Sequence, residues 1–188
     1  MYIMRTLIFS LPIALAGSLA IVERAPTTPF GLYAYGDEIG GAPVFTTGQG
    51  AYIGKASKVD DTEAAPVEFN LGTDNSLLGN PNATSGESTP TWSNLTFMVP
   101  DTTSSSHDVG FTNSTTTSER SSSGFIFYDQ FLLHRNLDGS LKSLWYAVPT
   151  EDEGVWYLRW NSTGDDSEGQ VLVSLKATAP SKPVDQVQ

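Results

Sequence analysis

The chain has 188 residues, of which 21 are acidic and 10 basic, so its formal net charge at pH 7 is −11. It contains two histidines and no cysteine. The absence of cysteine excludes disulfide frameworks, thiolate metal sites and cysteine nucleophiles. The negative charge argues against nucleic acid or anionic lipid as a partner, because both require a basic surface. The length suits a single domain with a core of its own.

The N-terminal segment MYIMRTLIFSLPIALAGSLA has the order of a secretory signal peptide. One positive charge, Arg5, precedes an apolar stretch, and small residues follow it. The apolar run of residues 7–22 is shorter than the roughly 20 residues that a membrane-spanning helix needs, and it contains Pro12. We therefore expect residues 1–20 to be a signal peptide and residues 21–29 a short pro-segment or arm. The mature protein is then secreted, with no membrane contact after the signal peptide is removed.

Asn-x-Ser/Thr sequons agree with export, because this motif accepts N-linked sugar in the secretory pathway. Ser and Thr make up about one residue in five, so chance produces about two sequons, and four are present. The predicted glycosylation sites are Asn82, Asn94, Asn113 and Asn161.

The rest of the chain shows β-branched and aromatic runs of four to eight residues, bounded by Gly, Pro, Asn and Asp. Helical periodicity is almost absent. We expect the polar segment 72–91 and the Ser/Thr-rich segment 101–123 to be long loops, and residues 180–188 to be a flexible tail. The predicted strands are 30–36, 43–47, 51–57, 66–71, 93–99, 124–129, 130–135, 140–148, 155–160 and 171–179.

About ten short strands in one domain, residues 30–179, predict an all-β fold. An antiparallel β-sandwich and a closed β-barrel both fit this pattern. A β-trefoil ranks lower, because no threefold repeat is visible. The successive hairpin signals from residue 131 to residue 179 favour a meander, in which each strand pairs with the next.

A carboxylate pair is the strongest catalytic alternative in this sequence. Glycoside hydrolysis needs two carboxyl groups on either side of the scissile bond. Glu68 and Asp129 are the candidates, since apolar residues flank each of them. The simpler interpretation is that Glu68 points outward from its strand and Asp129 marks a strand end.

Tryptophans suggest a second kind of site. Trp156 and Trp160 are four residues apart on one face of a predicted strand, about 13 Å at strand geometry. Two such rings form a platform for sugar rings if that face is exposed, and part of the core if it is buried. The acidic clusters at residues 60–63 and 165–168 are interpreted as solvated turn charges, with calcium binding as the alternative. We expect no metal site and no cofactor.

Two long segments resemble a group of cysteine-free secreted proteins of filamentous fungi. They are FGLYAYGDEIGGAPVFTTGQGAYIG at residues 30–54 and SLWYAVPTEDEGVWYLRWN at residues 143–161. The similarity extends over most of the mature chain, including LLGNPNAT and WSNLTFMVP. The resemblance implies a fungal origin and an extracellular or cell-wall location. It implies no catalytic residue, because the group has no established activity.

These observations favour a secreted, glycosylated, non-enzymatic protein that acts by binding at the fungal cell surface or in the host apoplast. Its role would be that of a wall-associated protein or an effector. The expected partner is a cell-wall polysaccharide or a host extracellular protein. The alternatives are a carbohydrate-active enzyme that uses Glu68 and Asp129, and a lectin-like module that uses Trp156 and Trp160.

Overall fold

A computed structural model describes residues 25–82, 90–114, 118–161 and 164–181. The predicted signal peptide lies outside these residues, as do residues 21–24 of the predicted arm and 182–188 of the predicted tail. Within the described ranges, no helix has the length and apolar character needed to cross a membrane.

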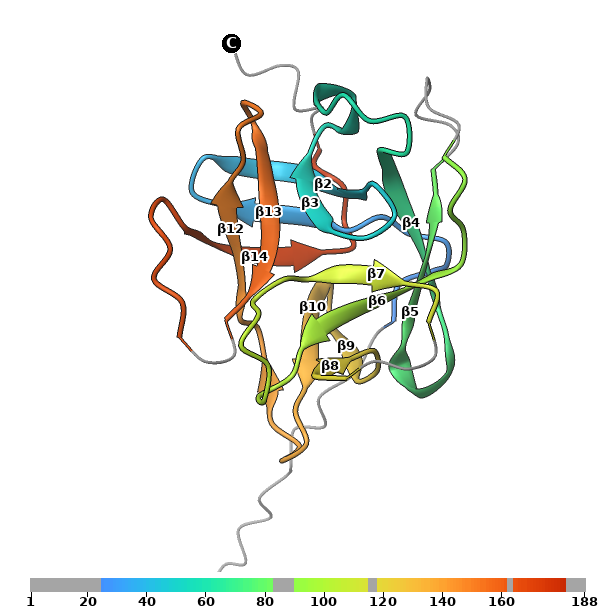
Figure 1. Cartoon of the computed structure of the whole chain (residues 1–188). Helices are drawn as coiled ribbons and strands as arrows, with labels where there is room; N and C mark the ends of the chain where they lie inside the picture. The colour runs from blue at the N-terminus through green and yellow to red at the C-terminus, as the bar shows by residue number, and fades with distance from the viewer. Residues whose placement is uncertain (1–24, 83–89, 115–117, 162–163, 182–188) are drawn as a thin grey trace, which may run out of the picture.

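The described chain is all-β and contains a closed six-stranded antiparallel barrel (Figure 1). Following the pairings, β1 lies beside β2, β2 beside β3, β3 beside β13, β13 beside β12, β12 beside β14, and β14 beside β1 again. The predicted all-β fold is confirmed, and of the two expected architectures the structure has the closed barrel, with six strands in it and the others outside. The barrel strands are β1 (Tyr33–Gly36), β2 (Ile39–Thr46), β3 (Ala51–Gly54), β12 (Trp145–Pro149), β13 (Val155–Trp160) and β14 (Val171–Lys176).

The six barrel strands come from the two ends of the domain and not from three equivalent units, so the β-trefoil alternative is wrong. The predicted meander is also wrong at its end. Strand β14 pairs with β12 and β1, while the second neighbour of β13 is β3. Barrel closure prevents β14 from pairing with β13, because the free edge of β13 pairs with β3, a strand from the N-terminal half.

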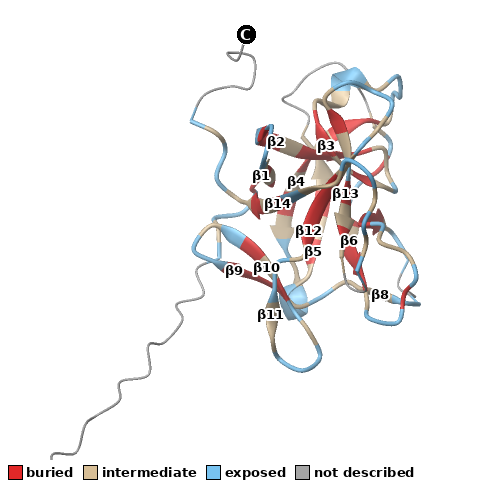
Figure 2. Cartoon of the chain, turned by 90° about the vertical axis from the view of Figure 1, so that its left-hand side faces the viewer, coloured by how far each residue is buried: buried red, intermediate tan, exposed pale blue. Residues whose placement is uncertain are grey.

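The middle of the chain forms strands outside the barrel. One row continues from β2 through β4, β5 and β6 to β7, with β8 also on β6. Strand β10 pairs with β14, and β9 and β11 each pair with β10 (Figure 2). Two 3₁₀ turns, η1 (Ala56–Lys58) and η2 (Thr73–Asn75), join the strands. The bounds are β4 (Ala65–Leu71), β5 (Leu77–Pro81), β6 (Leu95–Pro100), β7 (Gly110–Thr112), β8 (Arg120–Ser121), β9 (Phe125–Tyr128), β10 (Phe131–Arg135) and β11 (Leu141–Lys142).

Three of these outer strands lie in segments that the sequence analysis assigned to loops. Strand β5 falls within residues 72–91, and β7 and β8 fall within residues 101–123. All three are polar or glycine-containing, so they carry little strand propensity of their own. Their backbones are held by pairing with β4 and β6, and this is tertiary information.

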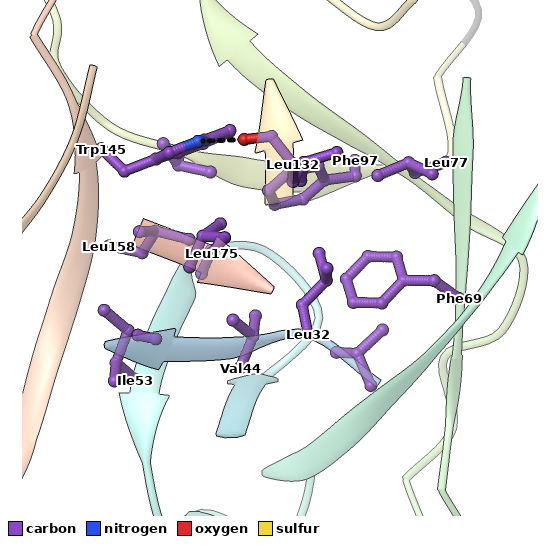
Figure 3. Close-up of a cluster of buried hydrophobic side chains, with 14 of the residues drawn as sticks. Leu32, Val44, Ile53, Phe69, Leu77, Phe97, Leu132, Trp145, Leu158 and Leu175 are labelled. Atoms are coloured by element: carbon purple, nitrogen blue, oxygen red, sulfur yellow. Dashed lines mark hydrogen bonds between the residues drawn. The ribbon is translucent and has the colours of Figure 1, made fainter. Parts of the chain in front are cut away.

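The core is continuous between the barrel and the outer strands (Figure 2). Trp145 and Trp160 meet inside the barrel with their ring centroids 4.5 Å apart, and Trp145 Nε1 donates to the carbonyl of Leu132 at 3.0 Å (Figure 3). The ring of Phe97 on β6 packs against that of Trp145, with centroids 6.2 Å apart, and against that of Phe69 on β4, with centroids 5.6 Å apart. Aromatic packing of this kind supplies the cohesion that disulfides supply in many secreted domains.

Candidate functional site

The tryptophan platform is not available for binding, because its face is the inside of the barrel. Trp160 is only 2% exposed, and Leu158 between the two tryptophans is fully buried. Trp156 is half-buried and packs against the same core. The predicted grouping of these side chains on one face of β13 is correct, but their assignment to a sugar platform is wrong.

The two candidate catalytic carboxylates lie outside the two hollows described below. Glu68 is half-buried on β4, on the opposite face from Phe69, and its strand partner is Asn80. Asp129 is exposed in the turn between β9 and β10, with a left-handed backbone. Neither side chain lines the two hollows described below.

The four sequon asparagines lie at strand ends. Asn94 and Asn113 are exposed, just before β6 and just after β7, whereas Asn82 and Asn161 are half-buried. Asn161 Oδ1 accepts from the backbone N–H groups of Gly164 and Asp165, at 2.7 and 2.8 Å. Asn94 and Asn113 therefore offer the more accessible side chains.

A row of aromatic rings crosses the outer face of the barrel, from β2 over β3 to β13. Cross-strand pairing sets Tyr52 opposite Phe45 on one side and opposite Tyr157 on the other. The ring centroids of Phe45 and Tyr52 are 5.2 Å apart, and those of Tyr52 and Tyr157 are 5.4 Å apart. Phe45 is buried, while Tyr157 is 39% exposed. The row therefore runs from a buried ring at Phe45 to a solvent-exposed ring at Tyr157.

A groove of about 1020 Å³ lies on one side of this pair of tyrosines, where β7 and the segment before β6 approach β3 and β13. Its buried apolar lining includes Trp92, Leu95, Met98, Val109 and Phe111. The polar side chains that line it, besides the two tyrosines, are Gln49, Thr91, Ser93, Asp108, Thr112, Asn113, Arg120 and Arg159.

Close backbone contacts fix the groove. The N–H of Ala51 donates to the carbonyl of Val109 at 3.1 Å, and the N–H of Phe111 donates to the carbonyl of Gln49 at 2.6 Å. A Cβ atom at Gly110 would lie 2.6 Å from that same Gln49 carbonyl, so only glycine permits this approach. The outer strand β7 is therefore tied directly to the barrel at β3.

Arg159 is held in the groove from two sides. Its guanidinium lies over the ring of Tyr157, with Cζ 5.2 Å from the ring centroid. Its Nη1 forms an ion pair with Asp108, which in turn accepts a hydrogen bond from the Ser106 hydroxyl at 3.1 Å. Asp108 and Arg159 also form a backbone bridge, so both ends of the ion pair are anchored.

A second hollow of about 550 Å³ lies on the other side of the same tyrosines. Tyr52 and Tyr157 line both hollows, so the pair forms a ridge between them. Burial, and secondarily the neighbouring Tyr157 phenol, raises the pKa of Tyr52, so this hydroxyl is neutral and able to donate at physiological pH. The charged side chains of the second hollow are Asp61, Glu151 and Asp152.

Sequence reasoning missed the tyrosine ridge, although part of its signal was present. Alternation in β13 places Tyr157 and Arg159 on the face opposite Trp156, Leu158 and Trp160. Tyr52 alternates in the same way with buried Ala51 and Ile53. The pairing of β3 with β13, which brings the two tyrosines together, has no local signal.

The ridge joins aromatic faces to hydrogen-bonding side chains. Among the described residues, no group of three or more His, Cys, Asp or Glu side chains has the arrangement of a metal site. Comparison of the chain with protein-family models, curated proteins and solved structures found no match. The arguments on function therefore come from the site itself.

Proposed function

We propose that this protein is secreted and glycosylated, and that it binds a polysaccharide along the Tyr52–Tyr157 ridge without transforming it. Its place of action is the fungal cell surface or the host apoplast, as a wall-associated protein or an effector. The signal-peptide pattern, the sequons and the resemblance to secreted fungal proteins support the location.

The observation that carries the binding proposal is the pair of half-buried Tyr52 and exposed Tyr157, which lies between two polar hollows. A sugar ring has apolar C–H faces and a rim of hydroxyl groups. Aromatic rings cover the faces, while neighbouring polar side chains bind the rim. The ridge supplies both, and the hollows on either side leave room for further sugar units.

The sequence suggests lectin-like binding through Trp156 and Trp160, which lie on the inward face of β13. We propose instead that the sugar binds to Tyr157, on the outward face of the same strand. The hydrolase alternative is not proposed, since Glu68 and Asp129 lie outside both hollows.

Tyr157→Ala tests the proposal. We expect wild-type protein to be retained on insoluble wall polysaccharide, and Tyr157→Ala to bind about tenfold more weakly, since ring contacts of this size contribute about 1 kcal/mol or more. The measurement is a depletion isotherm on glucan, chitin and pectin, with melting temperature as a check of folding.

Tyr128→Ala is the matched control, because Tyr128 is 50% exposed on β9 and lines neither hollow. Equal loss in both variants, or no loss in Tyr157→Ala, would place binding elsewhere. Failure of the wild type to bind any of the polysaccharides would reject the proposed function.

A further inference from the structure

The charges of the two hollows are opposite in sign. The larger groove is lined by Arg120 and Arg159 against one carboxylate, Asp108. The second hollow is lined by Asp61, Glu151 and Asp152, and the described residues that line it include no Lys or Arg. Two of the ten basic side chains of a protein with a net charge of −11 thus lie in one groove, beside the aromatic ridge.

Resting on the proposed function, we propose that the ligand of the larger groove is an acidic polysaccharide, whose carboxylates are bound by Arg120 and Arg159. Arginine suits this task because its planar guanidinium donates two parallel hydrogen bonds to a carboxylate. A uronic-acid unit presents such a carboxylate at the edge of its ring. The ring face can then lie against Tyr157 while the carboxylate meets the guanidinium.

The side chain of Arg159 is already held in position before a ligand binds. Its side chain is 26% exposed, and contacts with Tyr157 and Asp108 hold it in place. A guanidinium has five N–H donors, and the ion pair with Asp108 engages Nη1. Its Nε is buried without a hydrogen-bond partner among the described residues. Because Nε is buried, an incoming oxygen meets the terminal Nη groups, on a side chain that needs little ordering to bind it.

The net charge of the whole protein does not overrule this local arrangement. The Debye length at physiological ionic strength is about 8 Å, so carboxylates in distant loops are largely screened. Among the described residues that line the groove, the charged side chains are two arginines and the carboxylate of Asp108, which is paired with Arg159. The acidic second hollow repels the same ligand, so the polymer is expected to follow the larger groove and end at the ridge.

The experiment uses the protein after enzymatic removal of N-linked sugar, because Asn113 lines the groove. The probes are polygalacturonate oligomers, a neutral β-glucan of similar length and a chitosan oligomer, titrated calorimetrically at pH 7. We expect polygalacturonate to bind most tightly and to lose affinity as salt rises. Arg159→Gln and Arg120→Gln should each weaken its binding about tenfold.

Asp108→Asn is the decisive variant, because it releases Arg159 from its ion pair. We expect it to strengthen polygalacturonate binding several-fold, a gain that partial unfolding cannot produce. Arg135→Gln, an exposed arginine at the end of β10 and outside the groove, is the matched control and should leave affinity unchanged.

Other outcomes separate the two proposals. Binding of neutral glucan that depends on Tyr157 but not on the arginines would retain the proposed function and overturn the acidic ligand. Preference for chitosan, lost on Asp61→Asn, would also overturn it and move the site to the second hollow. Binding of none of the probes would reject both proposals.

Discussion

At the scale of single residues, His134 is a titratable side chain buried in the aromatic core. It is 6% exposed on β10 and lies against the rings of Phe125 and Trp160, at centroid distances of 5.3 and 5.7 Å. Its Nε2 meets the Ser121 hydroxyl and the Ser123 carbonyl, whereas Nδ1 is buried with no partner among the described residues. Burial lowers the pKa of His134 below its usual 6.5, with the contact to Ser123 opposing the shift.

This lowered pKa predicts that stability falls in mild acid. The unfolded chain takes up a proton at His134 near pH 6.5, before the folded protein does, so the free energy of unfolding declines as pH drops below that value. The slope from this one group reaches at most about 1.4 kcal/mol per pH unit. Urea unfolding between pH 7.5 and 5 measures it.

The His134→Gln variant should lose this part of the slope, because glutamine takes up no proton. His107→Gln is the control, as this half-buried histidine has different contacts: its Nδ1 meets the Trp160 carbonyl at 3.2 Å and its ring meets that of Tyr146. An unchanged pH dependence in His134→Gln would show that another group causes the decline.

At the scale of elements, the connection from β13 to β14 is organised by one carboxylate. Asp165 accepts a hydrogen bond from the Tyr146 hydroxyl on β12 and further bonds from the Ser167 hydroxyl and N–H, at 2.8 and 3.1 Å. The bond from Tyr146 is the main cause of the lowered pKa of Asp165. Burial is the main cause of the raised pKa of Tyr146, and the hydrogen bond to Asp165 and the negative charge of that residue raise it further. These contacts show that Asp165 ties its loop to the barrel wall, and they support the interpretation of this acidic cluster as a turn.

Tyr146→Phe is predicted to loosen that loop. The variant removes the hydroxyl donor to a carboxylate, and we expect the free energy of unfolding to fall by about 1–3 kcal/mol, the usual range for hydrogen bonds to charged groups. Hydrogen exchange should show faster exchange at Gly164 and Asp165, whose N–H groups donate to Asn161. Tyr128→Phe removes an exposed hydroxyl and should change neither measurement. Equal effects in the two variants would contradict a stabilising role of the hydrogen bond between Tyr146 and Asp165.

At the scale of the whole molecule, the barrel closes only when the two ends of the domain meet. Strand β1 pairs with β14 and β3 pairs with β13, across more than a hundred residues in each case. Trp145 and Trp160 fill the inside of this closure and contact Phe97 and His134 of the outer strands. The barrel and the outer strands therefore share one core and should unfold together.

Trp160→Ala is accordingly predicted to damage the fold rather than a binding surface. Removing a fully buried indole should lower the free energy of unfolding by about 3–5 kcal/mol. Trp156→Ala should cost less, since Trp156 is half-buried at the edge of the same core. Denaturant titration followed by fluorescence and circular dichroism makes the comparison. A Trp160→Ala variant as stable as the wild type would mean that the barrel interior is not the main core.

The strand pattern was readable from the sequence wherever the strand itself carries the apolar residues. In β13 the alternation of Trp156, Leu158 and Trp160 with Tyr157 and Arg159 is visible in the printed letters, and the structure keeps it. Strands such as β5 and β7 could not be predicted, because their conformation depends on partners distant in the chain. The same limit hid the site, since Tyr52 and Tyr157 become neighbours only through the pairing of β3 with β13.

The amino-acid sequence by itself determined that the fold is all-β, where its apolar strands run, and which side chains share a face, because these follow from local alternation. Only the tertiary structure decided which face of β13 closes inward. Both faces of that strand carry aromatic residues, and the curvature of the barrel encloses the tryptophans and leaves Tyr157 outside. It also decided where charge gathers, because Asp108, Arg120 and Arg159 meet only when β7, β8 and β13 converge on one groove.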